Sequence, residues 1–342
     1  LALLPDGKTL VSGCKDGTVC LWDTSVTHPH QPRINLPEAG DAWRFAPDSQ
    51  SVLTVNAQGQ LLRWSGSDFQ QKEAILETGT FGYHLISQDG RFLAVISGDG
   101  ILRVWDVSRR VLSHQLPTTK TSKQYPINFL AGGSKLLTGP AGVQAIRAIH
   151  EWDLTTGAEI QSWQVPEYAM AGVSPDERYC LAVADGVGLL RNLADKKSTS
   201  FQLGTLEEAQ VCYSTDGKLV AFGSDLGYAR VFNAATWQPV ATLGGFFGGV
   251  HGVAFSSDGQ RLLTCNDAAE ALKLWATDSW QNVLTFEGEG PGHFMGGGVA
   301  FSPDGNVVGR LSADGNLNLW RAPSWAEIHA AETQEKLPVQ QP

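Results

Sequence analysis

The stretch VAFSPDGNVVGRLSADGNLNLW, residues 299–320, decides the fold of this 342-residue chain. Val299 and Phe301 begin an alternation of apolar and polar residues that is typical of a half-buried strand. Residues 302–305 combine a proline that fixes φ, an aspartate that caps its own backbone and a glycine suited to positive φ. The Asp-Gly pair at 314–315 predicts a tight hairpin. The stretch therefore predicts three antiparallel strands joined by two turns.

Seven earlier copies of this unit precede it, and each ends in a strand with a tryptophan or a substitute at its closing position. Neighbouring closing positions are 39 to 47 residues apart, and in chain order they are Trp22, Trp64, Trp105, Trp152, Arg191, Phe232, Trp275 and Trp320. A unit this short cannot bury both sheet faces alone, so the copies must pack on one another. We interpret Arg191 and the following Asn192 as drift in a degenerate repeat.

The repeat pattern resembles the WD40-repeat family, whose repeats of about 40–45 residues supply four strands per propeller blade. The resemblance spans nearly the whole chain. It implies an all-β fold, a single β-propeller of four-stranded antiparallel blades over residues 1–325. Residues 326–342 are expected to form a short helical or disordered tail, and Ser324 with Glu327 has the chemistry of a helix start.

Ring closure depends on Arg33–Leu36, the fourth-strand candidate of the first repeat, because the last repeat has no such candidate after Trp320. In one closure, eight blades form the ring and the last blade has three strands. In the other, Arg33–Leu36 completes the last blade of a seven-bladed ring, and residues 1–23 belong to a neighbouring propeller. We favour eight blades; pairing of Arg33–Leu36 with Asn316–Trp320 would select seven.

The composition says little about the fold, but it limits the classes of partner that the chain is expected to bind. The chain has 25 Lys and Arg against 35 Asp and Glu, a net charge of −10, and lacks a clustered basic run. We therefore expect neither nucleic-acid nor anionic-membrane binding. No apolar run is long enough for a membrane span.

The first residue already lies in a predicted strand and is not methionine, so we expect covalently linked upstream domains. The five cysteines are expected to be buried thiols, which favours a cytoplasmic location.

A hydrogen-bond network recurs in the WD40-repeat family, linking a histidine before the inner strand, a Ser or Thr in the second strand, the hairpin aspartate and the tryptophan. The resemblance implies this structural role, rather than a catalytic triad, for matching residues in three repeats. These are His293, Ser312, Asp314 and Trp320 in the last repeat, Ser12, Asp16 and Trp22 in the first, and Ser97, Asp99 and Trp105 in the third.

Metal and cofactor sites are not expected. The eight histidines are scattered, and the nearest pair, His28 and His30, flanks a proline on a predicted loop. The glycine-rich stretches at 244–249 and 296–298 lack the Lys-Ser/Thr and the helix of a phosphate-binding loop. The longer segment between Thr138 and Trp152 is interpreted as an extended hairpin loop; the alternative is an insert that reaches over one face of the propeller and binds a partner.

Loops that lead from a fourth strand to the next inner strand carry aromatic residues. These candidates for partner binding are Phe81, Tyr125, Tyr168, Phe246, Phe247 and Phe294. Aromatic side chains bury much area at little entropic cost, so a group of them on one rim of the central channel would suit a protein or peptide partner. The alternative is that they fill gaps between blades.

Two functions remain open from the sequence. The resemblance implies a non-enzymatic protein-interaction scaffold. A further resemblance, to the degenerate WD40 arrays of large bacterial signalling proteins, implies the C-terminal docking or sensing domain of such a protein. The alternative is a propeller-based hydrolase or quinone-dependent dehydrogenase, which needs several acids converging at the channel mouth. The hairpin acids recur once per repeat, which favours turn geometry; they are Asp16, Asp99, Asp185, Asp225 and Asp314.

Overall fold

The structure is a computed structural model in which the placement of most of the 342 residues is described. The described residues are 2–5, 9–13, 19–23, 33–40, 42–79, 82–97, 99–116, 124–140, 147–166, 170–206, 210–246, 248–266, 270–287 and 298–322. The chain divides into two compact units, Leu1–Arg33 and Ile34–Pro342. The predicted helix start at Ser324 and the tail lie outside the described residues.

The first unit contains a three-stranded antiparallel sheet of β1 (Ala2–Leu3), β2 (Thr9–Gly13) and β3 (Val19–Asp23). Leu10 lies opposite Trp22, and Ser12 lies opposite Cys20. This register is that of the first three strands of the predicted repeat.

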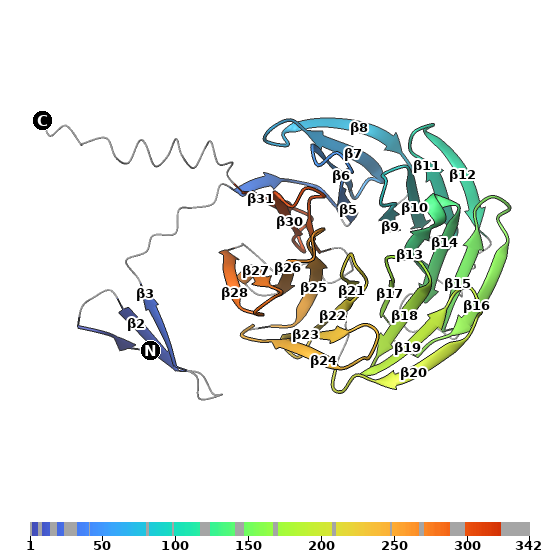
Figure 1. The fold of residues 1–342 in the computed structure, drawn as a ribbon. Helices are drawn as coiled ribbons and strands as arrows, with labels where there is room; N and C mark the ends of the chain where they lie inside the picture. Colours follow the sequence, from blue (N-terminus) through green and yellow to red (C-terminus); the bar gives the residue numbers. More distant parts are fainter. Residues whose placement is uncertain are drawn as a thin grey trace, which may run out of the picture. The chain divides into compact units, whose positions relative to one another are not determined.

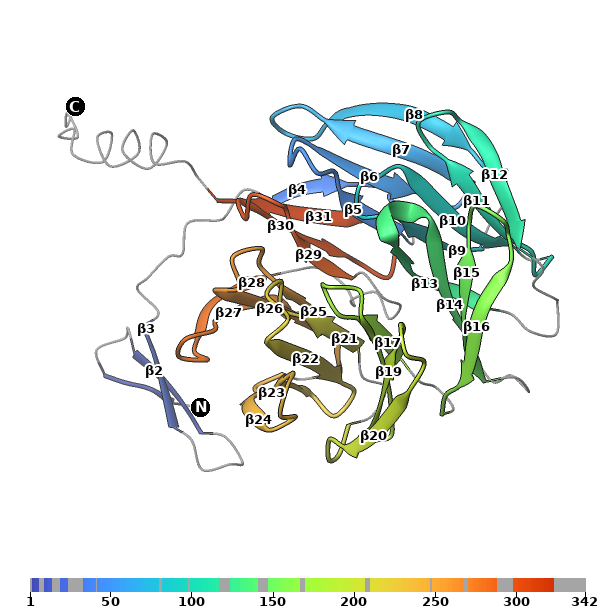
Figure 2. The ribbon, with the colours of Figure 1, turned by 45° about the vertical axis from the view of Figure 1, so that its right-hand side comes forward.

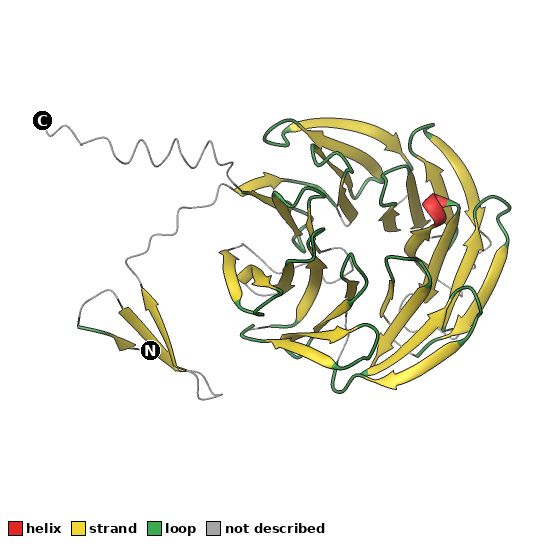
Figure 3. Ribbon diagram, in the orientation of Figure 1, coloured by secondary structure: helices red, strands yellow, loops and turns green. Residues whose placement is uncertain are grey.

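In the second unit, the described residues form seven four-stranded antiparallel sheets arranged as the blades of a ring (Figure 1). Each blade runs from an inner strand at the centre to an outer strand at the rim, and strands make up nearly all of its regular structure (Figure 3). One 3-10 turn, η1 (Ala131–Gly133), interrupts them. The predicted all-β propeller is confirmed. Among the described residues, the structure has no helix with the length and apolar character that a membrane crossing requires.

We number the blades by the order of their inner strands. Blade 1 holds β5 (Ala42–Phe45), β6 (Ser51–Val55), β7 (Gln60–Ser65) and β8 (Gln71–Glu77); blade 2 holds β9 (Gly82–Ile86), β10 (Phe92–Ser97), β11 (Leu102–Asp106) and β12 (Val111–Leu116); blade 3 holds β13 (Gln124–Leu130), β14 (Lys135–Pro140), β15 (Ala148–Asp153) and β16 (Glu159–Gln164). Blade 4 holds β17 (Met170–Val173), β18 (Tyr179–Ala184), β19 (Val187–Asn192) and β20 (Ser198–Gln202); blade 5 holds β21 (Gln210–Tyr213), β22 (Leu219–Ser224), β23 (Tyr228–Asn233) and β24 (Pro239–Leu243); blade 6 holds β25 (Val250–Phe255), β26 (Arg261–Asn266), β27 (Glu270–Ala276) and β28 (Asn282–Glu287). Blade 7 holds β29 (Val299–Phe301), β30 (Val307–Leu311), β31 (Leu317–Arg321) and β4 (Arg33–Leu36).

The ring closes through β4, which is the outer strand of blade 7 and pairs with β31 (Figure 2). The Asn35 side-chain amide donates to Oδ1 of Asn318 at 3.4 Å, across 283 residues of sequence. The preference for eight blades in the ring is therefore wrong, and the ring has seven blades. The assignment of residues 1–23 to a neighbouring propeller stays a prediction. The physical reason is the edge of β31: a three-stranded last blade would leave its backbone groups unpaired, and β4 pairs them.

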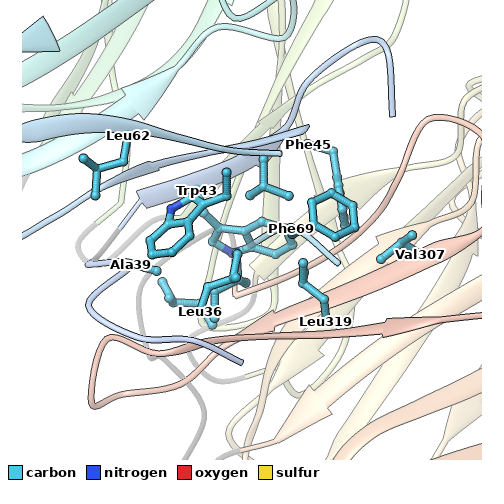
Figure 4. Close-up of a cluster of buried hydrophobic side chains, with 12 residues drawn as sticks. Leu36, Ala39, Trp43, Phe45, Leu62, Phe69, Val307 and Leu319 are labelled. Carbon is cyan, nitrogen blue, oxygen red and sulfur yellow. The ribbon is translucent and has the colours of Figure 1, made fainter. Parts of the chain in front are cut away.

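The core of the ring lies between blades rather than within any one of them. Buried hydrophobic residues of the described chain form seven clusters, and each joins two neighbouring blades. The cluster at the closure combines Leu36 of β4 and Leu319 of β31 with Trp43 of blade 1 (Figure 4). Because a lone blade has two apolar faces, each blade depends on both neighbours for its burial.

The turns between inner and second strands confirm the predicted chemistry. In blade 7, the Ser302 hydroxyl donates to Asp304 at 2.6 Å and accepts from the Val307 amide at 2.9 Å. Gly305 has φ 76°, a conformation that glycine adopts without a steric penalty. The same serine and aspartate pattern recurs in blades 4, 5 and 6, at Ser174, Ser214 and Ser256.

We predict that Leu36→Ala lowers the thermal stability of the protein. The Leu36 side chain is fully buried at the closure, and truncating such a leucine costs about 2–5 kcal/mol. The matched control is Val283→Ala on β28, where the side chain is 54% exposed and the expected cost is under about 0.5 kcal/mol. Thermal unfolding checks both variants. Equal melting temperatures for the two would contradict a stabilising role for β4.

Candidate functional site

The inner strands of the blades begin at one face of the ring, and that face carries an aromatic pair of which one member is exposed. Tyr83, near the start of β9, is 45% exposed, and its ring centroid lies 6.2 Å from that of Tyr125 in β13. Burial, with a smaller effect of Tyr83, raises the pKa of Tyr125. Tyr125 is thus the supporting partner and Tyr83 the accessible one.

The hairpins between second and third strands lie at the same end of the blades as the starts of the inner strands. In blade 5 this hairpin exposes Leu226 to 42%. The next residue, Gly227, has φ 81°, and Asp225 Oδ1 lies 3.2 Å from Nδ1 of His251. Apolar side chains of blades 2 and 5 are therefore accessible at this face, with charged groups beside them.

Two of the six predicted aromatic contacts lie among the described residues. Tyr125 is half-buried, as stated above. Phe246 is also half-buried, with its ring 6.1 Å from that of Trp275 and the Lys273 ammonium 4.6 Å above it. The other four, Phe81, Tyr168, Phe247 and Phe294, lie outside the described residues. The predicted patch stays a prediction. Tyr125, expected in a loop, lies in the strand β13, and Tyr83 in β9 was missed because only residues expected in loops were considered.

Inside the blades, tryptophan side chains donate to threonines of the second strand. Trp64 Nε1 lies 2.9 Å from Thr54 Oγ1, and equal distances join Trp152 to Thr138 and Trp275 to Thr264. In each case the threonine lies two residues after the residue that pairs with the tryptophan. The bond satisfies a buried indole N–H that would otherwise cost free energy.

In blades 4 and 5, the residue at the threonine position matches the residue at the closing position. Where Arg191 or Phe232 replaces tryptophan, the threonine position holds alanine or phenylalanine, which offer no acceptor. Two blades depart from this rule. In blade 2, Val95 occupies the position, and Trp105 Nε1 is buried without a hydrogen-bond partner among the described residues. In blade 7, Arg310 lies two residues after Val308, which pairs with Trp320. From the sequence we expected a Ser or Thr in the second strand and named Ser97 and Ser312, which lie two residues beyond this position in blades 2 and 7.

Comparisons with known proteins agree with this architecture. The family model described as WD domain, G-beta repeat, matches residues 1–23, 83–106 and 237–275. The chain is a WD40-repeat β-propeller. It is 22% identical over 289 residues to the serine-threonine kinase receptor-associated protein of Gallus gallus, covering 80% of this chain and 77% of that protein. It is 28% identical over 137 residues to the uncharacterized WD repeat-containing protein sll1491 of Synechocystis, covering 39% and 38% of the two chains.

Several residues of the predicted WD40 hydrogen-bond network are described. In blade 7, Ser312 donates to Asp314 and to the Asn316 carbonyl, and Trp320 is buried beside Phe286. In blade 2, Ser97 and Asp99 both accept from Arg103, at 3.0 and 3.1 Å. The four-residue network stays a prediction, because His293 and Asp16 lie outside the described residues, as do the side chains of Ser12 and Trp22.

Arg191 replaces the closing tryptophan of blade 4 and connects that blade to blade 3. Its guanidinium donates to Gln161 Oε1 at 3.0 Å and lies 5.3 Å above the ring of Trp163. Gln161 in turn donates to Glu151, a carboxylate that is 1% exposed and also accepts from Lys135 at 2.8 Å. Hydrogen bonds here replace part of the apolar contact that a tryptophan would supply.

Three of the described hairpin acids of the WD40 propeller, Asp99, Asp225 and Asp314, have partners close by. Hydrogen bonding from Arg103 lowers the pKa of Asp99 to about 2. Hydrogen bonding from Ser312 likewise lowers the pKa of Asp314, and Asn316 adds a bond of 2.7 Å.

Among the described residues, the structure brings together no group of three His, Cys, Asp or Glu side chains with metal-site geometry. His28 and His30 lie outside that part of the chain, as do residues 141–146 of the predicted long hairpin.

We predict that Val95→Thr stabilises the protein. The new hydroxyl would accept from Trp105 Nε1, as Thr54 does from Trp64, and such a bond contributes about 0.5–1.5 kcal/mol. The control is Val55→Thr, which buries a hydroxyl in a fully buried position without an indole donor and is expected to destabilise. Melting temperatures of both variants check the expectation. A lower melting temperature for Val95→Thr would contradict the assigned role of the threonine.

Proposed function

We propose that this WD40 propeller is a non-enzymatic scaffold that binds a protein or peptide at the face where its inner strands begin. WD40 propellers are typically protein-interaction scaffolds. The observation that carries the proposal is Tyr83, a large aromatic side chain that is 45% exposed on an inner strand. We further propose that the chain acts as a docking or sensing domain linked to other domains of a signalling protein.

The chemistry of Tyr83 suits an interface anchor. A tyrosine buries a large area with few rotatable bonds, and its hydroxyl still finds a polar partner. Tyr125 lies against it from the neighbouring blade, at 6.2 Å between ring centroids. Because both residues lie on paired strands, a partner that covers them causes little further loss of conformational entropy in this surface.

The alternative of an enzyme needs ionisable groups that converge on a substrate without binding one another. Asp99 is paired with Arg103 at 2.6 Å, and Asp314 accepts from its own hairpin. These contacts support a structural role for the hairpin acids. The name of the Gallus gallus relative, which describes association with a kinase receptor, is consistent with a binding role for this chain too.

We also propose a reducing compartment such as the cytoplasm. Cys180, Cys212 and Cys265 are free thiols. Burial raises the pKa of Cys180 to about 12 and that of Cys265 to about 11, so both side chains stay protonated at neutral pH.

The test is a selection of peptides from a phage-displayed random library on the immobilised protein, followed by affinity measurements on the peptides recovered. We predict that Tyr83→Ala weakens their binding by at least about tenfold, as expected for a central aromatic anchor. Val283→Ala, which removes an exposed apolar side chain from the outer strand β28, should change affinity by less than about twofold.

Two results would refute the proposal. Failure to enrich any peptide would contradict the scaffold function itself. Peptides that bind Tyr83→Ala and the unmodified protein equally well would contradict the assignment of this face. Melting temperatures of both variants show whether each remains folded.

A further inference from the structure

The turns from third to outer strands share one unusual residue. Four residues after the end of the third strand, the backbone has a positive φ between 56° and 73° in the six described turns of this kind. The residues at this position are Phe69, Arg110, Gly157, Lys196, Trp237 and Trp280 in blades 1 to 6. The shared backbone conformation places the side chains of Phe69, Arg110 and Trp237 against the preceding blade.

Aromatic residues at this position seal the seam between two blades. Trp237 of blade 5 stacks on Phe201 of blade 4, with ring centroids 4.1 Å apart. Phe69 of blade 1 is 3% exposed and packs in the cluster that contains Val307 of blade 7 (Figure 4). Trp280 of blade 6 packs against the cluster that joins blades 5 and 6. An aromatic ring therefore fills this gap at three of the seams.

Blade 2 has Arg110 at this position, and beside this turn the seam between blades 1 and 2, packed in its interior, leaves a pocket at the surface. The Arg110 side chain is 61% exposed, and a pocket of about 320 Å³ lies beside it. Blade 1 contributes Arg63, Glu73 and Ile75 to its walls, and blade 2 contributes Asp89, Arg91 and Val107. The pocket thus occupies a place that a large aromatic side chain occupies elsewhere in the ring.

The lining of this pocket, which we call the seam pocket, carries an excess of positive charge. It contains three guanidinium groups and two carboxylates, so its net charge is +1 in a chain whose net charge is −10. The closest approaches of Arg110 to Glu73 and of Arg91 to Asp89 are both 3.8 Å, longer than hydrogen bonds. The guanidinium N–H groups are therefore not fully used by the two acids.

The Asp89 carboxylate accepts hydrogen bonds from within its own turn. Its Oδ1 accepts from the Ser87 hydroxyl at 2.6 Å and from the Arg91 amide at 3.0 Å. The Val107 amide donates to the Arg91 carbonyl at 2.8 Å and so ties the two turns of blade 2 together. This backbone frame holds the base of the Arg91 side chain in place beside the pocket.

We propose that the seam pocket binds the carboxylate of an aspartate or glutamate side chain from an acidic segment of a protein partner. One carboxylate neutralises the net charge of +1, and arginine binds carboxylates through two parallel hydrogen bonds. A phosphate dianion would leave a net charge of −1 beside Glu73 and Asp89. Ile75 and Val107, 9% and 6% exposed, offer an apolar wall to the methylene groups of the inserted side chain.

The seam pocket lies at the opposite ends of the strands from Tyr83, because the turns that line it follow the inner and third strands. It is therefore a second surface of the protein. The inference rests on the proposed scaffold function only in taking the ligand to be part of a protein.

The probe is a fluorescein-labelled octapeptide of alternating alanine and glutamate, measured by fluorescence anisotropy at low ionic strength, where exposed charges are least screened. The expected result is binding at least about tenfold tighter than that of the matched alanine and glutamine octapeptide. Arg110→Gln should weaken binding of the glutamate peptide at least about tenfold, because charged hydrogen bonds are lost. The matched control is Arg109→Gln, an adjacent arginine whose side chain is 81% exposed and which does not line the pocket.

A second variant keeps the test independent of folding. Arg110→Trp introduces the residue that blades 5 and 6 carry at this position, so it should close the seam, maintain or raise the melting temperature and abolish peptide binding. Retained binding in this variant would overturn the proposal. Equal affinity for the glutamine peptide would overturn it as well.

An octapeptide of alternating alanine and phosphoserine separates the two anions. Tighter binding of this peptide than of the glutamate peptide would overturn the assignment to a carboxylate. The scaffold function is tested separately by the library peptides that depend on Tyr83. If those peptides bind normally while the glutamate peptide does not, the seam pocket proposal fails and the scaffold proposal stands.

Discussion

The pairing of β4 with β31 is the contact on which the rest of the ring depends. Each blade has two apolar faces, and the seven buried clusters show that every face is covered by a neighbouring blade. A linear array would leave two blades half exposed. Joining Arg33–Leu36 to the last blade covers the faces of blades 7 and 1 and pairs the edge of β31 in the same step. The closure therefore links stability at the two ends of the second unit.

At several buried positions of the repeat, the identity of one side chain is matched by that of its neighbour. Threonine in the second strand accompanies tryptophan in the third in blades 1, 3 and 6, since the indole N–H needs an acceptor. Where Arg191 replaces tryptophan, Gln161 and Trp163 of the preceding blade supply a hydrogen bond and a ring face. The repeats differ in sequence because different sets of side chains can meet the hydrogen-bonding and packing requirements of the same buried position.

The two surfaces that we assign to binding follow from the same geometry. Strands are occupied by packing, so recognition is left to the strand ends and turns. At one end, Tyr83 stands exposed beside Tyr125; at the other, Arg110 leaves a surface pocket at a position that aromatic residues occupy in blades 1, 5 and 6. The pocket beside Arg110 is a departure from the repeat, and such departures can give a scaffold specificity.

The sequence by itself determined the unit: its turns, its period and the alternation of its strands are local, and each is encoded within about 40 residues. It also placed the closing tryptophans, whereas the threonines that accept from three of them were found only in the structure. The number of blades was decided only by tertiary structure, because Arg33–Leu36 has the same local pattern whichever sheet it joins. Tertiary structure also decided which side chains are accessible at the surface. Tyr83 and Arg110 have ordinary local sequence, and their exposure depends on side chains from other blades, which local patterns do not encode.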